Sequence, residues 1–192
     1  MDIPAFVFQP LTLRGAKGHP AIVWVHENIR GHLYEHYIPY IREATAKGYI
    51  VIAPEYRGSL GYGQAFYDAI DYGGTEVDDV VTAAEVLKAK YPQVDPARIG
   101  IMGWSHGGMI TLLSIFRNPT LFKAALRSRK SSIAETMIYD NPPGGHTFDR
   151  RVDPNTWQPE NTREQRDSWN RVWTFLDWNL DPFHAAAPAS TK

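Results

Sequence analysis

The sequence contains no cysteine, no long hydrophobic run and no block of like charge, and each absence excludes a class of protein. Without cysteine, the chain forms no disulfide and carries no thiolate chemistry. The longest apolar runs, such as residues 49–54, have the length of a strand, so the sequence predicts no membrane-spanning segment. The 20 basic and 21 acidic residues are spread along the chain, which argues against nucleic acid or an anionic membrane as partner.

The first residues also lack the marks of an export signal. Residues 1–13 have no basic start followed by an apolar core, so we expect no signal peptide and, by default, a cytoplasmic location. A length of 192 residues, with 43% hydrophobic and 12% aromatic side chains, predicts a single packed domain. We expect this domain to cover residues 1–184 and the small polar residues 185–192 to form a disordered tail.

Short apolar segments alternate with longer amphipathic ones, which is typical of a mostly parallel sheet with helices on both faces. Strands are predicted at 5–8, 21–26, 49–53, 98–102 and 133–139. Helices are predicted at 39–48, from Thr75 onward, at 107–116, at 120–129 and from Thr162 to 180. Thr75 and Thr162 are the expected N-caps of their helices. The glycine- and tyrosine-rich stretch 54–74 predicts a loop with one short helical turn.

The sequence Gly103-Trp104-Ser105-His106-Gly107 lies between the predicted strand 98–102 and the predicted helix 107–116. This Gly-x-Ser-x-Gly pattern is typical of a nucleophile elbow. A strand that turns sharply into a helix strains the backbone of the serine, and side chains two positions away on either side would clash. The helix start supplies free amides and a positive dipole beside the hydroxyl. We therefore predict Ser105 as a nucleophile; a purely structural turn is the alternative.

His146 is the predicted partner of Ser105. It follows a predicted strand and the turn Pro142-Pro143-Gly144-Gly145, and active sites of open α/β sheets lie at the carboxyl ends of strands. There it would act as the base that takes the serine proton and returns it to the leaving group. The backbone amides of His106 and Asn28 are the expected oxyanion donors. Together these residues predict cleavage of an ester or amide bond through an acyl-enzyme.

Four segments resemble the catalytic domain of prolyl oligopeptidase-type serine hydrolases: 54–59 (PEYRGS), 95–100 (DPARIG), 103–109 (GWSHGGM) and 142–148 (PPGGHTF). Residues 25–28 (VHEN) are more similar to dienelactone hydrolases. Both groups belong to the α/β-hydrolase superfamily, and the resemblance extends over residues 5–180. It implies the same roles for Ser105, His146, Asn28 and His106. In dienelactone hydrolases the matching glutamate contacts the resting nucleophile, which makes Glu27 a candidate for that role here.

The chain departs from the superfamily between the nucleophile and the base. The acid of the triad normally follows a strand within this interval, and here the interval is short, as if about two strands and the acid loop had been removed. We therefore expect a shortened α/β-hydrolase fold. Asp140 and Asp149 are the favoured replacements for the acid. The other carboxylates considered are Glu27, Glu135 and Asp153; an acid from a partner chain and a bare Ser–His dyad are the remaining alternatives.

Two further interpretations concern metals and assembly. His32 and His36, with His26 and Glu27 nearby, form too partial a pattern for zinc, so we expect neither metal nor cofactor.

A catalytically impaired hydrolase fold, kept for binding or assembly, is the alternative function, and exposed strand edges would favour a homodimer. The expected substrates are short-chain or exposed esters first and short peptides second.

Overall fold

Four strands form one sheet in the computed structural model, which describes residues 1–33, 38–123, 140, 142, 144–156 and 158–182. The strands are β1 (Ala5–Phe8), β2 (His19–Val25), β3 (Ile50–Pro54) and β4 (Val94–Gly103), in the spatial order β1-β3-β2-β4. β2 pairs in parallel with both β3 and β4, whereas β1 pairs antiparallel with β3. Within the described residues, β1 and β4 are therefore the outer strands.

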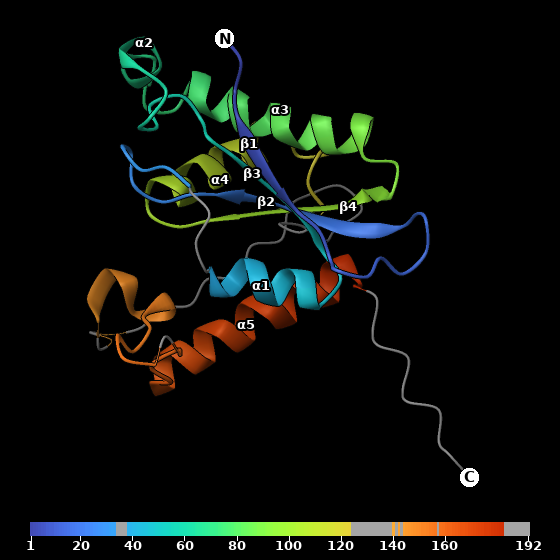
Figure 1. Cartoon of the computed structure of the whole chain (residues 1–192), viewed down its shortest axis with the longest axis vertical. Helices are drawn as coiled ribbons and strands as arrows, with labels where there is room; N and C mark the ends of the chain where they lie inside the picture. Colours follow the sequence, from blue (N-terminus) through green and yellow to red (C-terminus); the bar gives the residue numbers. More distant parts are fainter. Residues whose placement is uncertain (34–37, 124–139, 141, 143, 157, 183–192) are drawn as a thin grey trace.

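Helices cover both faces of this sheet (Figure 1). They are α1 (Pro39–Ala46), α2 (Gln64–Asp68), α3 (Thr75–Lys90), α4 (His106–Arg117), the 3-10 helix η1 (Gly145–Arg150) and α5 (Arg163–Leu180). Side chains of α3 and α4 pack on one face, and those of α1 and α5 pack on the other. The predicted fold class, a mostly parallel sheet between two layers of helices, is confirmed.

The central strand shows why both faces are covered. Successive side chains of a strand point to opposite faces. In β2, Ala21, Val23 and Val25 belong to the core under α3 and α4, while Ile22 and Trp24 belong to the core over α1 and α5. All seven residues of β2 are buried, as expected for a parallel strand enclosed on both faces. β2 is thus an inner strand of the sheet, and its last residue, Val25, is still buried.

Capping differs between the two long helices. Thr162 caps α5 as predicted, because its hydroxyl accepts the amide of Gln165 at 3.2 Å. The prediction for Thr75 is wrong: Thr75 is already the first residue of α3. The carboxylate of Asp71 instead accepts the amides of Gly74 and Thr75, at 2.9 and 2.8 Å. The side chain of Asp71, three to four residues upstream, thus caps the first amides of α3 in place of Thr75.

The segment after α4 also differs from the prediction. Residues 120–123 form a turn and a bend instead of the start of a helix. Leu121 and Phe122 are buried in the core beside β4, and the amide of Lys123 donates to the carbonyl of Ile99 at 2.8 Å. The rest of the predicted helix 120–129, the predicted strand 133–139 with Glu135, and the tail 185–192 lie outside the described residues. No helix in the described part of the chain is long and apolar enough to cross a bilayer.

Candidate active site

Ser105 occupies the turn between β4 and α4 with a strained backbone. Its φ of 51° and ψ of −121° lie outside the regions that non-glycine residues normally adopt, at a cost of about 1–3 kcal/mol. The residue is exposed, although Ile101 of the strand before it and His106 of the helix after it are buried. The Ser105 carbonyl accepts the amide of Met109 at 3.1 Å, which begins the ladder of α4. The turn thus presents a hydroxyl group to solvent at the carboxyl end of the sheet.

Close backbone packing explains the two glycines of the elbow. A Cβ on Gly103 would lie 2.6 Å from the carbonyl oxygen of Gly107 and 2.8 Å from that of Val25. A Cβ on Gly107 would lie 2.5 Å from the carbonyl oxygens of both Val25 and His26. All of these separations are too short for a real Cβ atom. The glycines therefore let the elbow sit directly against the end of β2 and the segment that follows it, residues 26–33, called here the β2 loop.

Asn28 takes a tight conformation in the β2 loop. Its φ of 67° lies in the left-handed region, which asparagine tolerates better than most residues. The Asn28 side-chain oxygen accepts the amide of Arg30 at 3.2 Å, and its carbonyl accepts the amide of Gly31 at 2.9 Å. Both Asn28 and Glu27 are exposed. The β2 loop thus turns back on itself at the position predicted to supply an oxyanion donor.

The side chain of His106 is buried away from the surface on which Ser105 is exposed. Its ring packs against Tyr56 and Tyr72, with centroids 5.8 and 6.1 Å apart, and its Nε2 lies 3.9 Å from Oε1 of Glu76. Burial lowers the pKa of His106 and raises the pKa of Glu76. His106 is the first residue of α4, so its own amide has no acceptor within the helix. The residue can therefore contribute its backbone amide while its ring serves packing.

A buried polar cluster lies beneath the β2 loop, and sequence reasoning did not find it. His26 Nε2 lies 3.0 Å from the hydroxyl of Ser59, and His26 Nδ1 lies 2.9 Å from the carbonyl of Glu27. The ring of Tyr56 stacks on His26 with centroids 4.1 Å apart and 11° between the planes. Burial, and secondarily the charges of His106 and His32, lowers the pKa of His26 to about 3. The ring is therefore neutral at physiological pH.

Glu55 completes this cluster. Its side chain is fully buried, its Oε1 accepts the amide of Leu33, and its Oε2 lies 3.7 Å from His26 Nε2. Burial raises the pKa of Glu55 to about 7, although the hydrogen bonds with Leu33 and Ser59 act in the opposite direction. Glu55, Tyr56 and Ser59 all belong to the segment 54–59 that resembles hydrolases. The resemblance of this segment to hydrolases is the one sequence feature that points to the cluster. It indicates the family but assigns no role to Glu55, Tyr56 or Ser59.

His146 and Asp149 lie on η1. His146 is exposed, and Asp149, three residues later, is buried. The carboxylate of Asp149 accepts the indole N–H of Trp104, the residue before the candidate nucleophile. Burial raises the pKa of Asp149, while the bond to Trp104 and the charge of His146 lower it. Within the part of the chain that the structure describes, no hydrogen bond joins the His146 ring to Ser105 or to Asp149.

The remaining carboxylates considered for the acid after the nucleophile are Asp153, Asp140 and Glu135. Asp153 accepts the amides of Asn155 and Thr156 at 2.8 and 3.0 Å, which lower its pKa and commit it to a turn. Asp140 is exposed, and Glu135 lies outside the described residues. Of these carboxylates, Asp149 has the best-defined link to the elbow.

Of the histidines considered as metal ligands, the structure describes His26 and His32. His26 is engaged with Ser59 and the carbonyl of Glu27, His32 is exposed, and His36 lies outside the described residues. Across the ranges that the structure describes, no three or more histidine, aspartate or glutamate side chains are arranged to hold a metal ion.

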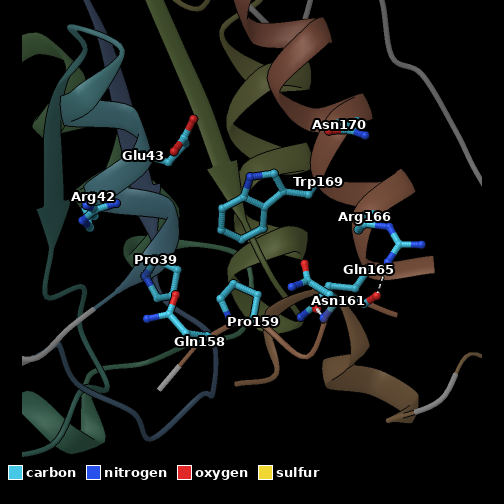
Figure 2. A pocket seen from close by; sticks show the side chains of 10 residues that line it. All are labelled: Pro39, Arg42, Glu43, Gln158, Pro159, Asn161, Gln165, Arg166, Trp169 and Asn170. Atoms are coloured by element: carbon cyan, nitrogen blue, oxygen red, sulfur yellow. Dashed lines mark hydrogen bonds between the residues drawn. The ribbon is translucent and has the colours of Figure 1, made fainter. Parts of the chain in front are cut away.

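A cavity of about 320 Å³ lies away from the elbow, between the beginnings of α1 and α5 (Figure 2). Trp169 reaches into it from α5, and Pro39 and Pro159 face it from the other side. None of the predicted catalytic residues lines this cavity. Trp169 packs on Tyr40 with centroids 4.0 Å apart, and Tyr40 packs on Trp104 at 4.8 Å. Contacts between aromatic rings therefore run from the cavity wall, through Tyr40, to Trp104 of the elbow.

Comparison with known proteins gives a family match. The model of the prolyl oligopeptidase family matches residues 36–179. The chain is 36% identical over 135 residues to the uncharacterized peptidase YuxL of Bacillus subtilis, covering 68% of this chain and 20% of that protein. It is 29% identical over 127 residues to human dipeptidyl peptidase 8, covering 62% of this chain and 14% of that protein.

The fold is also similar to that of solved peptidases. A puromycin-hydrolyzing peptidase of Mycobacterium tuberculosis superposes with a TM-score of 0.58 and 32% identity, over 63% of this chain and 19% of that one. The chain thus spans a fifth or less of the length of these relatives.

Proposed function

Since the chain belongs to the prolyl oligopeptidase family, we propose that it carries the acyl-transfer site of a serine peptidase, with Ser105 as nucleophile. Membership confirms the predicted resemblance to the α/β-hydrolase superfamily. The relatives are named as peptidases, one of them a dipeptidyl peptidase and another puromycin-hydrolyzing. These names favour peptide and aminoacyl amide bonds as substrates, whereas the sequence alone placed esters first. Short-chain esters remain proposed substrates, because the same acyl-enzyme forms from either.

The observation that carries the proposal is the backbone of Ser105. A residue is held at φ 51° only if its surroundings compensate the strain, and here two glycines allow the compensating contacts with β2. In the proposed reaction His146 removes the hydroxyl proton as Ser105 Oγ attacks the substrate carbonyl carbon. The amides of His106 and Asn28 stabilise the oxyanion. His146 then protonates the leaving amine or alcohol, and water releases the acyl group by the same steps.

We propose Asp149 as the carboxylate that supports His146. It is buried, it lies within the electrostatic influence of His146, and its bond to Trp104 ties η1 to the elbow. A buried negative charge near the imidazole stabilises the imidazolium that forms during the reaction. Asp140, by contrast, is exposed. Glu27, exposed on the β2 loop, stays the candidate for contact with the resting nucleophile.

Labelling and hydrolysis test the proposed function together. We expect a fluorophosphonate probe to label the protein, and a panel of p-nitrophenyl esters and aminoacyl p-nitroanilides to be cleaved. Ser105→Ala should abolish both. Ser168→Ala, the same change on the half-buried side of α5, is the matched control and should alter neither. A folded wild-type protein with no Ser105-dependent labelling would support the non-catalytic alternative.

A further inference from the structure

We propose that Tyr56 is a positioning residue that holds the β2 loop in the shape needed to present the Asn28 amide to the oxyanion. The inference deepens the proposed function and rests on it, because it concerns the same acyl-transfer site. Among the described residues, Tyr56 forms no hydrogen bond with Ser105 or His146, and its hydroxyl acts through the β2 loop. Its ring packs on His26 and on His106, and both ring contacts are kept when only the hydroxyl is removed.

The hydroxyl of Tyr56 contacts the β2 loop twice. It donates to the carbonyl of His26 at 3.1 Å and to the carbonyl of Asn28 at 3.3 Å. These two carbonyls flank Glu27, and one hydroxyl hydrogen shared between them holds both on the buried side of the β2 loop. Tyr56 itself is fully buried, so water does not compete for these bonds.

The peptide unit between these carbonyls is the one that matters chemically, because it carries the Asn28 amide. His26 Nδ1 lies 2.9 Å from the carbonyl oxygen of Glu27, and a neutral ring that donates there fixes that carbonyl. The chain has no cis peptide bond among the described residues, so the Asn28 N–H points opposite to the Glu27 carbonyl. A hydrogen bond that fixes the Glu27 carbonyl therefore also fixes the direction of the Asn28 N–H, the proposed oxyanion donor. The Tyr56 ring, stacked on His26, holds the imidazole in place for this bond.

Tyr56 is itself anchored on both sides. The amide of the preceding Glu55 donates to the carbonyl of Pro4 at 2.8 Å, which extends the pairing of β1 with β3. The following Arg57 forms an ion pair with Asp79 of α3, with Nη2 and Oδ1 2.5 Å apart, and its backbone amide donates to the same carboxylate at 2.9 Å. These contacts connect Tyr56 to the rigid sheet and to α3. The hydrogen bonds of Tyr56 therefore connect the β2 loop to the sheet and to α3, in addition to the hydrogen bonds within the loop itself.

Tyr56→Phe tests the inference, because it removes the hydroxyl and keeps the ring that stacks on His26. Tyr49→Phe is the matched control: Tyr49 is equally buried, and its hydroxyl donates to Asp177 at 2.9 Å in the α5 layer. Loss of an oxyanion donor costs about 10²–10³ in kcat, so a donor that is only misplaced should cost about tenfold. We expect Tyr56→Phe to lower kcat about tenfold with KM nearly unchanged. A boronic acid that mimics the tetrahedral intermediate should bind about tenfold more weakly.

Amide hydrogen exchange gives a readout that needs no turnover. Residues 26–31 should exchange faster in Tyr56→Phe than in the wild type, and at the wild-type rate in Tyr49→Phe. If Tyr56→Phe does not fold, Ser59→Ala weakens the same cluster through His26 and should give the same changes at smaller size.

The outcomes separate the inference from the function it rests on. Wild-type hydrolysis that Ser105→Ala abolishes, together with equal kcat in the two tyrosine variants, would overturn the positioning role and leave the proposed function standing. Unchanged exchange of residues 26–31 in Tyr56→Phe overturns the positioning role whatever the activity. If the wild type shows neither hydrolysis nor labelling, the proposed function is overturned. In that case, exchange of residues 26–31 that is faster in Tyr56→Phe and unchanged in Tyr49→Phe would still support the role of Tyr56 in ordering the β2 loop.

Discussion

Replacing Glu55 by glutamine should stabilise the protein at neutral and alkaline pH and leave its stability almost unchanged near pH 4.5. Glu55 is fully buried, and its pKa is raised to about 7. Glutamine resembles the protonated acid: its amide oxygen can accept the N–H of Leu33, and its amide N–H can face His26 Nε2. The substitution thus keeps the neutral hydrogen-bonding partner and removes the charge that burial penalises.

The direction and size follow from the two pKa values of Glu55, about 7 in the folded chain and an ordinary 4.5 in the unfolded one. Between pH 4.5 and 7 the folded state keeps a proton that the unfolded state has released, so wild-type stability falls as pH rises. Below pH 4.5 both states are protonated, and above pH 7 the penalty is fully present. At 1.36 kcal/mol per pH unit, the advantage of Glu55→Gln above pH 7 reaches about 3 kcal/mol at most.

His26 makes the shape of the wild-type curve distinctive. Its pKa is lowered to about 3 from an ordinary 6.5, so its contribution to stability is lost as pH falls from 6.5 towards 3. Between pH 4.5 and 6.5 this slope opposes that of Glu55, and the pair together contributes a plateau. In Glu55→Gln only the His26 slope remains. The variant should therefore gain stability with rising pH over a range where the pair leaves the wild type nearly flat.

Urea unfolding of both proteins at intervals from pH 4 to pH 8.5 measures this difference. The same substitution at the exposed Glu85 of α3 controls for the loss of one negative charge. A free-energy difference between wild type and Glu55→Gln that stays constant from pH 4.5 to 8 would refute the reasoning, because Glu55 would then not titrate in this range in the folded protein.

Three further substitutions test the elbow and its partners. His146→Ala should slow hydrolysis as far as loss of the nucleophile does, and steady-state rates should show the double variant to be no slower, because both groups act in one step. Asp149→Asn should lower kcat by about tenfold or more while Asp140→Asn leaves it unchanged; equal rates in these two variants would favour a Ser–His dyad. Gly107→Ala should destabilise the fold by about 1–3 kcal/mol in chemical denaturation, since its Cβ would lie 2.5 Å from two carbonyl oxygens. Gly108→Ala, with its nearest contact at 3.4 Å, should be neutral or slightly stabilising.

The elbow could be predicted from the sequence because its residue pattern is local, although the contacts that require its glycines come from β2. Two glycines around a serine, between an apolar strand and an apolar helix, leave the backbone few alternatives, and the structure has the strained turn at Ser105. The continuous apolar runs of β2 and β3 likewise identified buried strands. The catalytic roles of Ser105 and His146 stay predictions, since they depend on chemistry that geometry alone does not measure.

The support beneath the site could not be predicted, because it joins residues far apart in sequence. Nothing local indicates that the hydroxyl of Tyr56 meets the carbonyl of His26, or that Asp149 meets Trp104. The helix predicted at 120–129 does not begin at residue 120 for a related reason: the burial of Phe122 beside β4 outweighs the local helical pattern of residues 120–123. Tertiary contacts decide which polar groups are buried and whether a short apolar segment such as 120–123 becomes helical.

The strained backbone of Ser105 lowers the stability of the fold, while the proposed reaction requires the serine side chain, so selection for stability and selection for activity oppose each other at this position. Glycine adopts such a conformation freely, so the chain would be more stable, by about 1–3 kcal/mol, if it lacked the side chain on which its proposed chemistry depends. Mutations that relieve strain are common and easily accepted when activity is not required. In a lineage that ceased to need the reaction, this position would drift towards glycine, and the pattern by which the elbow is recognised would be among the first features lost.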